Sequence, residues 1–243
     1  MSAQPTIVRY GDACFKHRGL MLPAAILLLF IPSPSLSSNA VLTGLIGLLL
    51  ALAGQLIRIA NVGMVYIIRG GQGHKVYADT LVTGGLYNHV RNPMYVGNAL
   101  LLAGLAVASN AWVFAIGGVL IGVAVHVGII AAEEYFLRGK FGEQYVDYCR
   151  RVPRIVPRLG GLSRSLEGVT FNGGRVIDKE YMEPVDWLSA TAIVAVIALW
   201  RARQLHVGWP VILIAIVVIV ARLALWRRRK QRQRAATAGA SRA

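Results

Sequence analysis

Long apolar runs constrain this chain more than any other feature of its sequence. Two of them, Ala40 to Ile59 and Ala111 to Ala132, each reach the roughly 20 residues that a helix needs to cross a bilayer core. A third run, Trp209 to Trp226, comes close to that length. Because 56% of the residues are hydrophobic and lie in such runs, an ordinary soluble domain is excluded. We expect an all-α, polytopic transmembrane helical bundle.

Three shorter runs bring the expected number of spans to five or six. Met94 to Ser109 is continuous, prolines interrupt Leu20 to Ile31, and acidic residues stop Trp187 to Trp200 on one side. With both termini in the cytosol, Arg201 and Arg203 are the only basic residues outside, which agrees with the positive-inside rule. We therefore expect a multi-pass protein of a bacterial-type inner or plasma membrane, with its active site and cofactor pocket on the cytosolic side.

The basic charge of the chain, formally +15, indicates a membrane partner rather than nucleic acid. A Lys/Arg cluster directly after a span anchors topology and attracts anionic lipids, whereas nucleic-acid binding needs a folded basic surface. Cys14 and Cys149 show no metal-ligand spacing, so we expect no metal site. The oligomeric state stays open. The cluster consists of Arg227, Arg228, Arg229, Lys230, Arg232 and Arg234.

Composition along the chain predicts three parts. Residues 1–59 are expected to form a polar lead of 18 residues and a transmembrane hairpin, and residues 60–158 a catalytic core. Residues 159–243 are expected to form a cytosolic linker, two further spans and the basic tail. Charged and aromatic residues alternate over 133–148, which predicts an interfacial amphipathic helix that ends before Pro153.

Two polar segments flank the expected helical hairpin at its two ends, and a hairpin would bring them to the same membrane surface. Residues 85–97 read Gly-Leu-Tyr-Asn-His-Val-Arg-Asn-Pro-Met-Tyr-Val-Gly, and a Glu-Glu pair stands at 133–134. Together they closely resemble the isoprenylcysteine carboxyl methyltransferase and phospholipid methyltransferase family of membrane enzymes. The mark of that family is Arg-His-Pro-x-Tyr-x-Gly followed by Glu-Glu. The resemblance covers residues 78–158, about a third of the chain.

The resemblance implies S-adenosylmethionine as cofactor, held by the first glutamate of the pair, Glu133. It also implies that the four residues around Pro93 line the cofactor pocket, together with a backbone stretch that precedes them. Gln72 is a further candidate in the preceding loop. The residues concerned are Asp79, Thr80, Leu81, Val82, Asn92, Pro93, Met94 and Tyr95.

The residues themselves leave alternatives open. Glu133 and Glu134 close an apolar helix, where the helix dipole disfavours negative charge, so Arg91, Arg138 or Arg151 must otherwise offset them. A carboxylate also suits the amino group or ribose of the cofactor.

Tyrosine side chains near Pro93 have two readings of the same kind. Tyr87 and Tyr95 offer aromatic faces to a sulfonium ion, or they are ordinary interface tyrosines. Pro93 itself suits the first turn of a helix, whose free amides bind anionic groups.

Two departures from the family pattern restrict the chemistry. Asn92 stands where the family has histidine, so this side chain cannot shuttle a proton. Ile129 stands where the prenylcysteine branch has an arginine for the substrate carboxylate, which argues against a prenylcysteine and for a less acidic, lipophilic acceptor.

Three polar residues near the expected site are candidates for catalysis: His89 as a general base, and Arg91 and Arg154 as contacts for an anionic head group. Each is equally well explained as a surface or lipid-contacting residue. His126, within an apolar run, is either a buried polar contact or part of a substrate tunnel.

The predicted function is therefore methyl transfer from S-adenosylmethionine to an oxygen, nitrogen or sulfur atom of a lipophilic or membrane-embedded acceptor. One alternative is an NAD(P)H-dependent membrane reductase of a lipid double bond, which would need basic contacts for the nucleotide phosphates. Another is a transporter or lipid-binding protein, which would place polar residues in the middle of several spans. The acceptor itself stays open.

Overall fold

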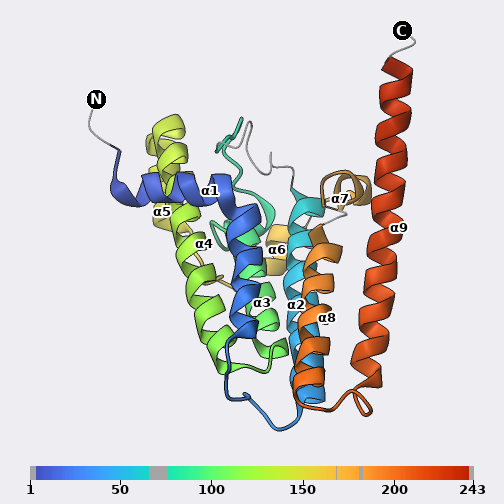
Figure 1. The fold of residues 1–243 in the computed structure, drawn as a ribbon. Coiled ribbons are helices and arrows are strands. Elements are labelled where there is room, and N and C mark those ends of the chain that lie inside the picture. Colours follow the sequence, from blue (N-terminus) through green and yellow to red (C-terminus); the bar gives the residue numbers. More distant parts are fainter. Residues whose placement is uncertain (1–3, 66–75, 168, 181–182, 241–243) are drawn as a thin grey trace.

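The computed structural model describes residues 4–65, 76–167, 169–180 and 183–240. Within these ranges every regular element is a helix, which confirms the all-α prediction. The long helices stand side by side, and the short helices gather at one end with the N- and C-terminal residues (Figure 1). The long helices are α1 (Thr6–Ala24), α2 (Ala40–Met64), α3 (Pro93–Ala108), α4 (Trp112–Phe141), α8 (Glu183–Arg201) and α9 (Trp209–Ala240). The short ones are η1 (Ala25–Phe30), η2 (Gly85–Asn88), α5 (Glu143–Arg151), α6 (Leu162–Leu166) and α7 (Gly173–Glu180).

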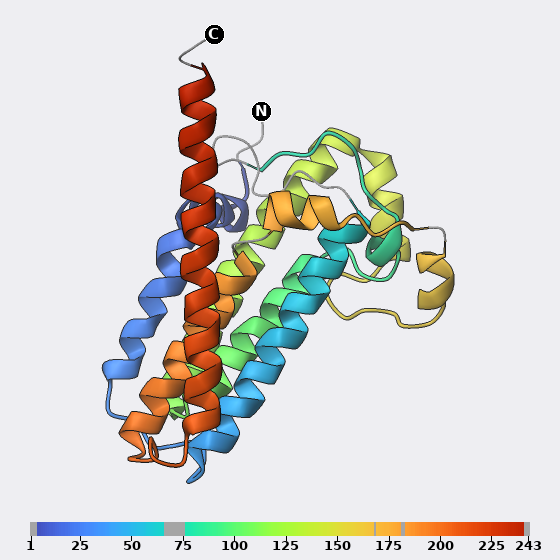
Figure 2. The ribbon, with the colours of Figure 1, turned by 90° about the vertical axis from the view of Figure 1, so that its right-hand side faces the viewer.

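Three stretches of the described chain are long and apolar enough to cross a membrane: α2, α4 and the Trp209–Arg227 part of α9. Helix α3 is equally apolar but shorter. Helix α9 runs along the outside of the bundle, beside α8 (Figure 2). Only 11% of its apolar stretch is buried, so its side chains are left for the lipid.

The N-terminal region differs from the expectation of a polar lead over residues 1–18, because α1 already begins at Thr6. Its first part lies across the end of the bundle and its second part runs down beside α4 (Figure 1). Cys14 and Phe15 are buried against Val125 of α4. This apolar face gives the segment a reason to be helical and docked.

The glutamate pair also differs from expectation, because it does not close the apolar helix. Helix α4 continues through Glu133 and Glu134 to Phe141. The break comes at Gly142, whose φ of 52° is a conformation that L side chains rarely adopt. The pair therefore lies inside α4 rather than at its negative end. Pro153 follows the end of α5, as expected.

Helices α2 and α3 approach each other unusually closely because glycines face glycines. A Cβ atom built on Gly54 would lie 2.6 Å from the carbonyl oxygen of Gly97, and one on Gly97 would lie 2.7 Å from Cγ of Arg58. This contact places the Arg58 side chain beside Asn98 of α3, to which it donates a hydrogen bond.

Candidate functional site

The two polar segments meet, as the hairpin argument predicts. The backbone amide of Arg91 donates to the carbonyl of Pro153 at 2.8 Å. The hydroxyl of Tyr148 donates to the carbonyl of Tyr87 at 2.7 Å. These bonds join residues about sixty positions apart and fix the start of α3 next to α5.

Glu134 anchors this junction through two arginines. Its carboxylate lies 3.3 Å from Nη1 of Arg91 and 2.9 Å from Nη2 of Arg154. Burial acts to lower the pKa of Arg91, but the carboxylate of Glu134 outweighs it, so the pKa of Arg91 is raised. Of the three arginines expected to neutralise the glutamate pair, Arg91 does so, and Arg154 takes the second place.

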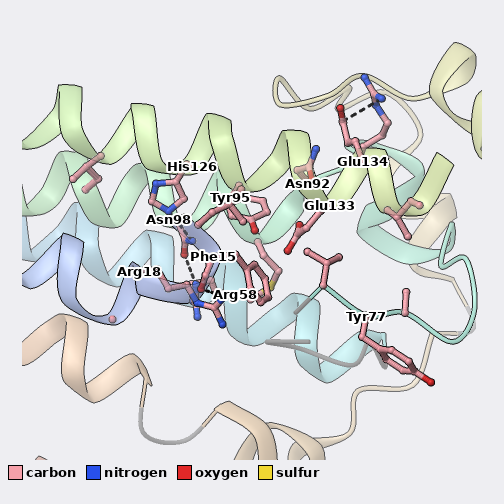
Figure 3. Close-up of a pocket in the computed structure, with 18 of the residues that line it drawn as sticks. Phe15, Arg18, Arg58, Tyr77, Asn92, Tyr95, Asn98, His126, Glu133 and Glu134 are labelled. Atoms are coloured by element: carbon pink, nitrogen blue, oxygen red, sulfur yellow. Dashed lines mark hydrogen bonds and ion pairs between the residues drawn. The ribbon is translucent and has the colours of Figure 1, made fainter. Parts of the chain in front are cut away.

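A cavity of about 790 Å³ opens beside this junction and extends between the helices. Its volume lies in the range usual for small-molecule sites. It brings together most of the residues that the sequence suggested for the cofactor (Figure 3). Those lining it are Asp79, Thr80, Leu81, Val82, Tyr87, Asn92, Met94, Tyr95 and Glu133.

The remaining candidates lie elsewhere. Pro93 is buried at the first turn of α3, as expected, but does not line the cavity. Gln72 lies outside the described residues. Arg91 lines the cavity while holding Glu134. His89 is buried outside the cavity, with Nδ1 2.6 Å from the carbonyl oxygen of Arg158.

Glu133 points differently from its neighbour. Figure 3 shows Glu133 beside Tyr95, with Glu134 turned away toward its arginine. The side chains of Glu133 and Tyr95 are hydrogen bonded, and the positive charge of Arg18 also acts on Tyr95. Tyr95 therefore stands between a negative and a positive group inside the cavity.

Two tyrosines of α5 complete the outer wall. Burial, followed by the charge of Glu134, raises the pKa of Tyr145. Burial, followed by the neighbouring Tyr87, raises the pKa of Tyr148. Both hydroxyls are therefore neutral at physiological pH and leave two aromatic rings against the cavity.

Sequence reasoning missed a second polar group at the inner end of the cavity. Arg58 was expected to reach the membrane interface, yet it is 3% exposed and lines the cavity. Its hydrogen-bond partner Asn98 lies, through Nδ2, 3.2 Å from Nε2 of His126. Arg18 of α1 lies over the ring of Phe15, and both line the same space. Figure 3 shows this group on the far side of Tyr95 from Glu133.

The innermost lining is apolar. It comes from η1, α3, α4 and α8, so the cavity uses all three parts into which the sequence was divided. A molecule with a polar head and an apolar chain would fit this lining. The residues are Ala25, Ile26, Leu102, Leu105, Phe114, Gly118, Trp187 and Ala190.

In the part of the chain that the structure describes, no three His, Cys, Asp or Glu side chains are grouped to hold a metal ion. The polar residues of the cavity are those suited to organic ligands: carboxylates, guanidinium groups, an amide and tyrosines.

Comparison with known proteins gives a consistent family signal. Residues 42–144 match the sequence model of the phospholipid methyltransferase family. The cobalt-zinc-cadmium resistance protein CzcN of Cupriavidus metallidurans is 33% identical over 112 residues, which cover 46% of this chain and 50% of that protein. The nickel-cobalt-cadmium resistance protein NccN of Alcaligenes xylosoxydans xylosoxydans is 30% identical over 153 residues, 63% of this chain and 68% of that protein.

Protein-S-isoprenylcysteine O-methyltransferase B of Arabidopsis thaliana is 36% identical over 90 residues, which cover 37% of this chain and 43% of that protein. The chain thus spans between about two fifths and two thirds of the length of these relatives. No solved structure matches it significantly.

Proposed function

Because the chain belongs to the isoprenylcysteine carboxyl methyltransferase and phospholipid methyltransferase family, we propose that it transfers a methyl group from S-adenosylmethionine to a lipophilic acceptor. The cofactor enters from the cytosol, and the acceptor enters from the bilayer. Residues 60–158 supply most of the cofactor site, with α1, α2 and α8 closing the cavity around it.

The observation that carries the proposal is the continuity of one cavity. Its outer end is lined by Asn92, Met94, Tyr95 and Glu133, and its inner end by apolar side chains from the helices. A water-soluble methyl donor and a lipid-soluble acceptor therefore have adjoining places in a single space. Holding two reactants aligned and away from water is a large part of what such an enzyme must do.

The outer lining suits the groups of S-adenosylmethionine. The carboxylate of Glu133 accepts hydrogen bonds from an amino group or ribose hydroxyls. The first turn of α3 attracts a carboxylate. The rings of Tyr87 and Tyr95 give a sulfonium ion aromatic faces. When bound, the cofactor supplies an electrophilic methyl group.

The three polar candidates for catalysis receive different roles in this proposal. Arg91 and Arg154 hold Glu134 and so position the wall of the site. His89 is a positioning residue, because its ring contacts the Arg158 carbonyl and ties the segment after α5 to the segment before α3.

Calorimetric binding to the full chain in lipid nanodiscs tests the proposal. We expect S-adenosylmethionine and S-adenosylhomocysteine to bind with micromolar Kd, and binding to weaken at least tenfold in Glu133→Gln and Tyr95→Ala, since charge-assisted bonds contribute about 1.5–3 kcal/mol. Glu143→Gln and Tyr135→Phe are matched controls, because both side chains are exposed and outside the cavity. They should bind like the unaltered protein.

NADPH is the comparison ligand in the same experiment. Folded protein that binds neither methyl-cycle ligand contradicts the proposal. Folded protein that binds NADPH instead supports the reductase alternative, although the cavity lining offers few basic groups for its phosphates.

A further inference from the structure

A chain of hydrogen bonds crosses the inner end of the cavity from helix to helix. Arg58 of α2 donates to Oδ1 of Asn98 on α3. Nδ2 of Asn98 then lies 3.2 Å from Nε2 of His126 on α4. Nδ1 of His126 lies 2.6 Å from the carbonyl oxygen of Gly122. A carbonyl only accepts, so Nδ1 carries the proton and Nε2 accepts from Asn98.

This polar group lies at a defined depth below the proposed cofactor site. His126 precedes Glu133 by seven residues on α4, which is two helical turns or about 10 Å along the axis. Asn98 follows Tyr95 by one turn on α3. Both pairs share a helix face. A head group held at Arg58 therefore lies just inside Tyr95, on the membrane side of the methyl donor.

From this geometry we propose that Arg58 and Arg18 form the head-group site for an acceptor that enters as a carboxylate on a lipophilic chain. Asn98 and His126 orient Arg58. The proposal rests on the proposed function and deepens it by naming the class of acceptor.

The charges at this end favour an anion. Arg18 and Arg58 both line it, and a guanidinium group stays protonated at any physiological pH. Electrostatic interactions are strong in a cavity shielded from water. A carboxylate gains from both cations, whereas an alkylammonium acceptor meets two like charges. Aliphatic amines and phospholipid amines are therefore disfavoured here.

Proton accounting points the same way. Both ring nitrogens of His126 already have partners, and Asn92 cannot act as a base. The carboxylates that line the described cavity each interact with another side chain. These pairs are Asp79 with Tyr77, Glu133 with Tyr95, Glu134 with Arg91 and Arg154, and Asp186 with Arg222. An acceptor that is ionised before it binds needs no base.

The reaction balances without a proton transfer. A carboxylate oxygen uses a lone pair to form the bond to the methyl carbon, while the sulfur–carbon bond breaks and its electron pair stays on sulfur. One anion and one sulfonium ion become a neutral methyl ester and a neutral thioether. No oxidant, reductant or metal takes part.

The inference also corrects an expectation drawn from the sequence. Ile129 in place of arginine on α4 favoured a less acidic acceptor. In the structure, cations reach the cavity from other helices, through Arg18 of α1 and Arg58 of α2. The absence of a cation at position 129 therefore does not leave the cavity without one.

Direct binding of tritium-labelled palmitic acid tests the site without relying on turnover. The probe is added to the full chain in phosphatidylcholine nanodiscs, and binding to empty nanodiscs is subtracted. We expect saturable binding that unlabelled palmitic acid competes away, and that hexadecylamine and hexadecanol do not. Arg58→Gln should weaken binding at least tenfold, in line with a lost charged hydrogen bond. Arg58→Lys should recover part of it.

Two further variants keep the test decisive. Gln55→Leu is the matched control: Gln55 is equally buried on α2, has no hydrogen-bond partner among the described residues, and does not line the cavity. It should leave palmitate binding unchanged. Arg18→Gln, at the partly exposed end of the site, should weaken binding severalfold even if Arg58→Gln does not fold. Equal palmitate binding by folded Arg58→Gln and Arg18→Gln overturns the proposal.

Binding of S-adenosylmethionine separates this proposal from the proposed function. Arg58→Gln should bind the cofactor within threefold of the unaltered protein, because the site lies about 10 Å from Glu133. With methyl-labelled cofactor, label should move into a hexane-extractable, base-labile ester of palmitic acid. Transfer to hexadecylamine instead overturns the carboxylate proposal and leaves methyl transfer standing. Palmitate binding that depends on Arg58, in a protein that does not bind the cofactor, would support the head-group site and overturn the methyltransferase.

Discussion

The two ends of the cavity are built in different ways. The outer end comes from continuous segments, 76–95 and 133–148, whose polar groups bond to one another. The inner end comes from single side chains on separate helices, among them Arg18, Arg58, Asn98 and His126. The difference teaches that the outer end can be read as a motif, whereas the inner end exists only once the helices are packed.

The glutamate pair shows the same contrast on a smaller scale. Successive residues on a helix point about 100° apart. Glu133 therefore faces the cavity and Tyr95, while Glu134 faces Arg91 and Arg154. One carboxylate is left for a ligand because the other carries the structural load of the junction. The sequence predicted a role for the pair but not this division.

Removing the charge of Glu134 should break the outer end most severely. Glu134→Gln leaves Arg91, whose side chain is 16% exposed, without its carboxylate. Losing one member of a largely buried pair costs roughly 2–4 kcal/mol. We expect thermal unfolding in detergent to shift down by several degrees. Arg154→Gln removes the more exposed partner, at 42%, and should cost under about 1 kcal/mol. Equal losses in the two variants would contradict the assignment of Arg91 as the main partner.

The inner end should fail through packing rather than charge. Gly54→Ala would place a Cβ 2.6 Å from the carbonyl oxygen of Gly97, a backbone atom that cannot rotate away. Helices α2 and α3 must then separate, at about 1–3 kcal/mol, and Arg58 must move from Asn98. The same unfolding measurement applies, together with palmitate binding.

Gly139 supplies the control for that substitution. It also lies in a helix, but a Cβ there has no atom within 4 Å. Gly139→Ala should therefore be neutral or gain up to about 1 kcal/mol from helix propensity. If Gly54→Ala is as stable as Gly139→Ala, the close approach of α2 and α3 does not hold the inner end together.

The sequence was sufficient for the fold class and for the outer end. Apolar runs predicted the helices, and a hairpin between two polar segments predicted their contact, now seen from Arg91 to Pro153. Pro93 marked the start of α3 correctly. These features depend on neighbours in the chain, so they can be read without knowing the packing.

The inner end could not be predicted for a physical reason. Arg58 in an apolar run near the membrane surface has two outcomes, reaching the interface or turning inward, and hydropathy does not distinguish them. Its direction depends on the approach of Gly97, and Asn98 gains meaning only as the partner of Arg58. The docking of α1, which brings Arg18, depends in turn on its contact with α4.

Alkaline pH should weaken the outer end selectively, with the smallest effect of the three. The pKa of Tyr148 is raised by burial, then by Tyr87. Above the unfolded value of about 10, the folded state binds more protons than the unfolded state, so stability falls as pH rises. Half a unit above pH 10 the loss is about 0.8 kcal/mol for this tyrosine. Unfolding midpoints between pH 8 and about 10.5 should fall less steeply in Tyr148→Phe. Tyr135→Phe, at an exposed position, should keep the original slope. An unchanged slope in Tyr148→Phe would mean that the α5 wall opens before the protein unfolds, and the outer end would then be the mobile one.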